Sequence, residues 1–164
     1  MTILPGWWRV HFLAAEMGLS LIITICFAIW VECFGGALPL EQTLAGNRNA
    51  VYGTLASIFG SLLGFVITAV SIVLGYSASD RLQIVRESKH YPILWKTFIA
   101  AIRCLGLATL VAMLGLLLDR DASGRRWILH LCVFASLLAI ARLARCVWIL
   151  ENVVRLVTFH PKKD

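Results

Sequence analysis

The stretch VYGTLASIFGSLLGFVITAVSIVLGY, residues 51–76, contains no charged side chain. A helix needs about 20 apolar residues to cross the hydrocarbon of a bilayer, so this stretch predicts a membrane-spanning helix. The whole chain has the same character: of its 164 residues, 60% are hydrophobic and 15% are charged, with a mean hydropathy of +0.84. Soluble domains are about half apolar and a quarter charged, which makes a bilayer the fitting solvent.

Three more apolar stretches of similar length lie on either side of this one, at residues 18–39, 97–118 and 127–148. The sequence therefore predicts an all-α integral membrane bundle of four transmembrane helices, forming a single domain over residues 1–164. The segments that follow the second and fourth spans, residues 77–92 and 149–160, carry apolar stripes without strong breakers and are expected to continue as helices outside the membrane.

The basic residues predict which way the chain crosses. One side of the membrane would hold Arg9, Arg81, Arg86, Lys89, Lys96, Arg155, Lys162 and Lys163, and the other Arg48, Arg120, Arg125 and Arg126. Cytoplasmic loops carry the excess of Lys and Arg, so both termini are expected in the cytoplasm. The helical extensions would then offer a docking surface to a cytoplasmic protein.

Small and weakly polar residues recur at steps of three and four along the second span, which places them on one helical face. This candidate stripe consists of Ser57, Gly60, Ser61, Gly64, Thr68 and Ser71. Three roles fit it: the lining of a water-filled path, the seam of an oligomer, or a close contact between helices of one bundle. Glycine serves close packing better than conduction, which favours the two packing roles.

Four ionisable residues fall inside the predicted spans: Glu32, Arg103, Arg142 and Arg145. Charges inside a membrane are costly and need a compensating role. The arginines are expected to extend to the cytoplasmic headgroups, with a basic ring that binds anions or acidic lipids as the functional alternative. Glu32 would either form an acidic ring or reach the outer interface.

Enzyme chemistry has no support in the sequence. The four histidines lie in separate regions, the five cysteines form no Cys-x-x-Cys pair, and no nucleophile elbow or phosphate-binding loop occurs. No catalytic, metal-binding or cofactor-binding residues are therefore assigned. The formal net charge of +6 is spread over loops beside the spans, so anionic lipids explain it better than direct contact with nucleic acid.

The residues from Gly60-Ser-Leu-Leu-Gly-Phe-Val through Ser79-Asp-Arg-Leu82 and His90-Tyr91 to Phe98-Ile-Ala100 resemble a pattern in small bacterial four-span proteins. The pattern is similar to that of membrane subunits of phage-defence systems, such as the one of Kiwa. The resemblance implies a homo-oligomeric subunit of the bacterial inner membrane, with a tetramer as one candidate stoichiometry. Such a subunit would form a pore or sense membrane perturbation together with a cytoplasmic partner. The alternative is an accessory subunit of a larger membrane complex.

Overall fold

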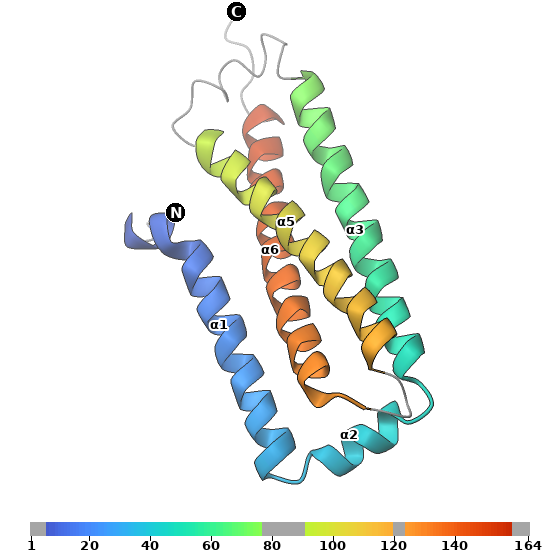
Figure 1. Cartoon of the computed structure of the whole chain (residues 1–164). Coiled ribbons are helices and arrows are strands. Elements are labelled where there is room, and N and C mark those ends of the chain that lie inside the picture. Colours follow the sequence, from blue (N-terminus) through green and yellow to red (C-terminus); the bar gives the residue numbers. More distant parts are fainter. Residues whose placement is uncertain (1–5, 77–90, 120–123, 159–164) are drawn as a thin grey trace, which may run out of the picture.

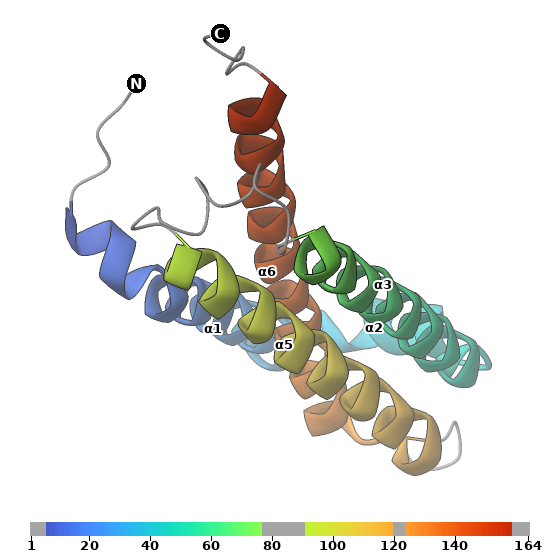
Figure 2. The ribbon, with the colours of Figure 1, turned by 90° about the horizontal axis from the view of Figure 1, so that it is seen from above.

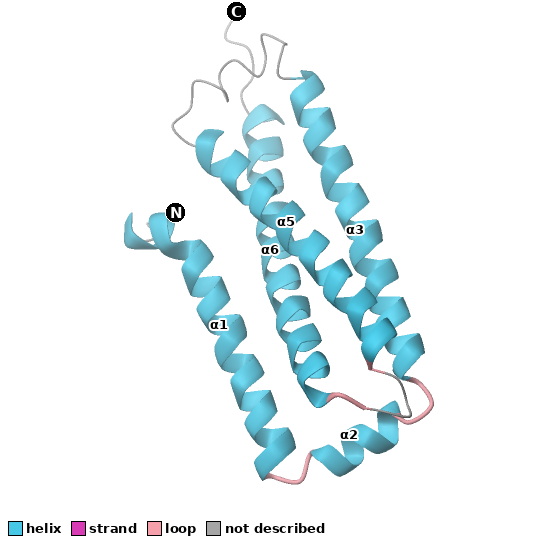
Figure 3. Ribbon diagram, viewed as in Figure 1, coloured by secondary structure: helices cyan, strands magenta, loops and turns pink. Residues whose placement is uncertain are grey.

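The computed structural model describes residues 6–76, 91–119 and 124–158, and within them the regular structure is entirely helical (Figures 1 and 3). The helices are α1 (Gly6–Cys33), α2 (Ala37–Leu44), α3 (Arg48–Tyr76), α5 (Tyr91–Leu118) and α6 (Arg126–Thr158). The four long helices run alongside one another, and the short α2 lies across one end of them (Figure 1). We call this end the α2 end, and the end near Gly6 and Thr158 the terminal end.

All four long helices are long and apolar enough to cross a membrane. Their candidate spans are Phe12–Cys33, Arg48–Ile72, Trp95–Leu118 and Arg126–Glu151. Each helix also turns large apolar side chains outward: Ile22, Phe65, Leu107 and Ile140 are all more than half exposed. Side chains of this kind need lipid around them, so the predicted all-α bundle of four membrane-type helices is confirmed.

The ends of the helices differ from the predicted boundaries. The first span was expected to reach Pro39, but α1 ends at Cys33 and Pro39 belongs to α2. The chain turns between them at Gly35, whose φ of 75° suits glycine better than any other residue. At the terminal end, α5 already begins at Tyr91, and α6 continues past its membrane span to Thr158 as one helix. The expected extension over 77–92 lies almost entirely outside the described residues.

Helices α3, α5 and α6 share an apolar core. The main cluster joins Phe59 and Val66 of α3 to Phe98 and Leu105 of α5, and Ala139 of α6 completes it. Alanines at the contact let the helix backbones approach closely, which is how helices pack when lipid surrounds them. These fully buried alanines are Ala101, Ala108 and Ala112. A second cluster, nearer the α2 end, joins Tyr52, Ala112, Ile128 and Cys132.

Helix α1 is held in a different way. It packs on α6 and lies on the opposite flank of the molecule from α3 (Figures 1 and 2). Among the described residues, α1 contributes no side chain to either apolar cluster. Its buried side chains are Phe12 and Val31, which are apolar, and the hydroxyl residues Ser20 and Thr24. The structure therefore consists of a three-helix apolar core and a fourth helix whose contact with α6 mixes apolar and polar side chains.

A close approach between α3 and α5 gives a test of the core. A Cβ atom added to Gly115 would lie 2.7 Å from Cδ1 of Tyr52. The tyrosine ring has little freedom to move, because it is fully buried and its hydroxyl donates to Asp119 at 2.6 Å. We expect Gly115→Ala to lower the free energy of unfolding by about 1–3 kcal/mol, the usual range for overpacking. Unfolding in increasing SDS, monitored by circular dichroism, measures this change in the free energy of unfolding.

The matched control is Gly106→Ala on the same helix. A Cβ atom at Gly106 would meet nothing within 4 Å. Alanine has the higher helix propensity, so this change should leave stability equal or slightly improved. Equal losses for the two variants would contradict the close approach at Tyr52.

Candidate functional site

The small-residue stripe of α3 faces away from the rest of the protein. The opposite face of α3 packs on α5 through Tyr52, Phe59 and Val66, three buried residues at steps of seven. By contrast, Gly60 of the stripe is partly exposed and its other members are exposed. The exposed members are Ser57, Ser61, Gly64, Thr68 and Ser71.

The two glycines of the stripe have open space beside them within the part of the chain that the structure describes. A Cβ atom built at Gly60 or at Gly64 would meet nothing within 4 Å, helix backbone aside. Of the three roles considered for the stripe, a close contact between helices of one bundle has no partner helix among the described residues. The sequence separates a small-residue face of α3 from a face of larger side chains, but it does not show which of the two another helix covers.

The hydroxyls of the stripe are partly satisfied within α3 itself. Thr68 Oγ1 donates to the carbonyl oxygen of Gly64 at 2.9 Å, and Ser71 Oγ donates to that of Ile67 at 2.9 Å. A hydroxyl that bonds back to its own helix does not require water, so it tolerates lipid or a second helix beside it. The outer face of α3 is thus chemically able to serve as a helix–helix seam.

A second polar group lies between α1 and α6, near the terminal end. We call it the Glu16 cluster: Glu16 of α1 with Arg142 and Arg145 of α6. Arg142 Nη1 and Glu16 Oε2 lie 2.8 Å apart, as an ion pair that lacks the geometry of a directed hydrogen bond. Arg142 Nη2 also donates to the backbone carbonyl of Leu13 at 2.8 Å. Arg145 Nε donates to Glu16 Oε1, and its guanidinium stands 4.2 Å from the centre of the Phe12 ring.

The Glu16 cluster changes the interpretation of the intramembrane arginines. Arg142 is 7% exposed, so its charge is enclosed by protein and does not extend freely to the headgroups as expected. Arg145 is partly buried beside it. Arg103 behaves differently, since it is exposed on α5 and takes no part in the cluster. Glu16 was missed because it lies just ahead of the predicted first span, whereas α1 begins well before it.

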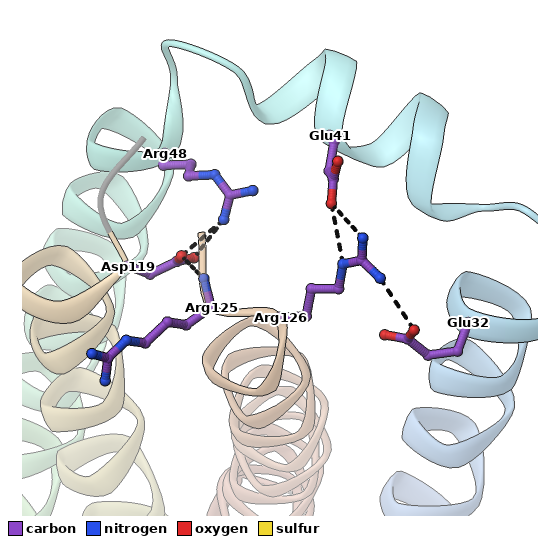
Figure 4. Close-up of polar contacts among 6 residues, drawn as sticks. All are labelled: Glu32, Glu41, Arg48, Asp119, Arg125 and Arg126. Carbon is purple, nitrogen blue, oxygen red and sulfur yellow. Dashed lines mark hydrogen bonds and ion pairs between the residues drawn. The ribbon is translucent and has the colours of Figure 1, made fainter. Parts of the chain in front are cut away.

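Glu32 lies at the α2 end in an exposed group of charges (Figure 4). Arg126, at the start of α6, reaches Glu32 at 3.2 Å and Glu41 of α2 at 2.8 Å. The side chains of all three are nearly half exposed. Glu32 thus links α1 to α6 and α2 within one protomer. Pairs this exposed contribute little to stability.

The most completely buried charge is Asp119, at the end of α5 (Figure 4). Its carboxylate accepts two hydrogen bonds from Arg48 Nη1, at 2.8 and 2.9 Å, and one from the hydroxyl of Tyr52. It also accepts a hydrogen bond from the backbone N–H of Arg125, just before α6 begins. The side chain of Arg125 points away from the carboxylate (Figure 4). We call this group the Asp119 cluster. It joins the ends of α3, α5 and α6, and nothing in the sequence pattern indicated it.

Neither cluster has the composition of a metal centre. Within residues 6–76, 91–119 and 124–158, no three His, Cys, Asp or Glu side chains gather where they could hold an ion. The five cysteines are free: Cys26 and Cys33 are exposed on α1, and the other three are buried or half-buried. The polar groups that the structure brings together are suited to holding helices and anions.

Comparison with known protein families, curated proteins and solved structures found no match to this chain.

Proposed function

We propose that the chain is the subunit of a homo-oligomeric membrane assembly that forms through the outer face of α3. The observation that carries this proposal is the outward position of Gly60 and Gly64, where an added Cβ atom would meet no described residue within 4 Å. Glycines four residues apart let two helix backbones approach closely in lipid. An uncovered pair of this kind supports a neighbouring helix from a second copy as its partner.

The side chains beside the stripe support the same partner. Ile58 and Phe65 are exposed next to it, and large side chains that flank a glycine groove can pack against the facing helix. In a closed ring of copies, Ser57 and Ser61 would bring hydroxyls to the subunit boundary or to a central path. We therefore propose that the assembly forms a pore or responds to perturbation of the membrane.

The remaining features of the proposal rest on the sequence. The excess of basic residues at the terminal end favours a cytoplasmic location for that end, and the apolar stripe of residues 149–160 favours a cytoplasmic protein partner. The inner membrane and a role in phage defence are proposed from the resemblance of residues 60–100 alone. A plaque assay with cells that express the chain and its neighbouring genes would test the defence role.

The proposed contact between copies through α3 is tested by Gly64→Leu. A leucine at this position has open space within the protomer, so it should leave the fold of the monomer intact while it forces neighbouring copies apart. We expect the mass of the purified particle, measured by light scattering in detergent, to fall to that of a smaller species. Gly106→Leu, an equally uncrowded glycine on α5, is the control and should keep the parent mass.

An unchanged mass for Gly64→Leu would contradict the proposed contact between copies through α3.

Ion flux into liposomes tests conduction. Substitution of Ser57 or Thr68 by valine should alter the flux if these hydroxyls line a path. A silent particle that co-purifies with other membrane proteins would instead favour the alternative, an accessory subunit.

A further inference from the structure

The Glu16 cluster carries more positive than negative charge. Two guanidinium groups, from Arg142 and Arg145, face the single carboxylate of Glu16. A guanidinium stays protonated in proteins, so the cluster holds an excess of one positive charge inside a membrane-spanning part of the chain. Among the described residues, Glu16 alone is paired with these arginines, and an unbalanced charge in this environment is costly, which favours a further anion beside them.

The donors that remain belong mainly to Arg145. Its hydrogen bond to a described residue comes from Nε, and this leaves both Nη groups for another acceptor. The guanidinium carbon lies over the Phe12 ring, and this cation–π contact helps to hold the guanidinium in place. The Arg145 side chain is 18% exposed, against 8% for Arg142, so it is the member of the pair that opens to the surroundings.

The position of Arg145 within the candidate α6 span favours a lipid phosphate as this anion. It lies six residues before Glu151, the end of the α6 span, which is about 9 Å along the helix. A dissolved anion would have to leave water to reach this depth, whereas a lipid brings its phosphate to the edge of the hydrocarbon. The planar guanidinium also matches phosphate oxygens in a bidentate arrangement.

We propose that Arg145, supported by Arg142, binds the phosphate of an anionic phospholipid beside the α1–α6 seam, in the leaflet at the terminal end. Glu16 orients both guanidinium groups and neutralises one of their two charges. The lipid phosphate neutralises the second positive charge, and the lipid lies beside the contact between α1 and α6. This site lies on the opposite flank from the outer face of α3, so it does not depend on the proposed oligomer.

The experiment measures lipid selection by the full chain. The protein is reconstituted into vesicles of equimolar phosphatidylcholine and phosphatidylglycerol, extracted in mild detergent, and its bound lipids are counted by native mass spectrometry. The parent protein should retain phosphatidylglycerol in preference. In Arg145→Gln the ratio of bound phosphatidylglycerol to bound phosphatidylcholine should fall about tenfold, as expected for the loss of a charge-assisted contact.

Arg103→Gln is the matched control, because it removes the same charge from an exposed arginine outside the cluster. It should keep the parent preference for phosphatidylglycerol. An undiminished preference in Arg145→Gln, or equal losses in the two variants, would overturn the proposal, since diffuse attraction to the basic protein would then explain the retention. Arg145→Lys keeps the positive charge but lacks the planar guanidinium that can bind phosphate through two donors, so it should give an intermediate loss. This variant guards against a result caused by misfolding.

A final experiment distinguishes a lipid phosphate from a free phosphate anion as the ligand. Inorganic phosphate is added to the delipidated protein, and the melting temperature is followed by tryptophan fluorescence beside a sample given phosphatidylglycerol. Stabilisation by phosphatidylglycerol alone, lost in Arg145→Gln, supports the lipid. Equal stabilisation by inorganic phosphate would overturn the assignment to a lipid.

Discussion

Asp119→Ala is expected to lower the free energy of unfolding by about 3–5 kcal/mol, the range for removing one partner of a buried ion pair. The loss arises from what stays behind: the Arg48 guanidinium, the Tyr52 hydroxyl and the Arg125 N–H would all lose their acceptor. Arg48 is almost as buried as Asp119, so little water can replace the carboxylate. The charge of Arg48 would remain in protein without compensation.

The measurement is SDS titration of the purified protein, followed by circular dichroism. Arg126→Gln provides the contrast, since it removes an exposed arginine at the same end of the molecule and should change stability little. Asp119→Asn keeps the shape of the side chain and some accepting capacity, so it should fall between these two. A loss for Asp119→Ala no greater than that for Arg126→Gln would refute the role given to the buried cluster.

The second large effect is expected at Glu16. Glu16→Ala would leave Arg142 and Arg145 facing each other with no carboxylate between them. We expect a loss of about 3–5 kcal/mol, and we expect it to appear as release of α1 from α6. The three-helix apolar core should survive, because α1 gives no described side chain to it.

Crosslinking distinguishes release of α1 from global unfolding. Cysteines placed at Phe27 and His130, whose rings are 5.9 Å apart across the seam, report whether α1 is docked on α6. Their crosslinking yield should fall strongly in Glu16→Ala, while the helical content of the protein stays near that of the parent. Glu32→Gln, at the exposed end of the same seam, should leave the yield unchanged. Equal yields with and without Glu16 would show that the cluster does not hold α1.

The number and class of the helices could be predicted because hydropathy is local. Residues 51–76 have to be a helix in lipid whatever surrounds them, and α3 occupies Arg48–Tyr76. The break after Cys33 was harder to see, since the short α2 is apolar and follows α1 closely. A turn at Gly35-Gly36 was the available signal.

The polar contacts could not be predicted because their members are far apart in the chain. Arg48 and Asp119 are 71 residues apart, and Glu16 and Arg145 are 129 residues apart. Each looks like an ordinary charge near the end of a span, and only the packing order of the helices brings the partners together. The outward direction of the α3 stripe was hidden for the same reason, since it depends on which face α5 covers.

The attachment of α1 to α6 through charged residues has a consequence for biogenesis. In the order of synthesis α1 precedes α6, and Arg145 follows Glu16 by 129 residues, or roughly 10 s at usual translation rates. During that interval Glu16 cannot pair with Arg145. Completion of α6 is therefore the step that fixes the position of α1.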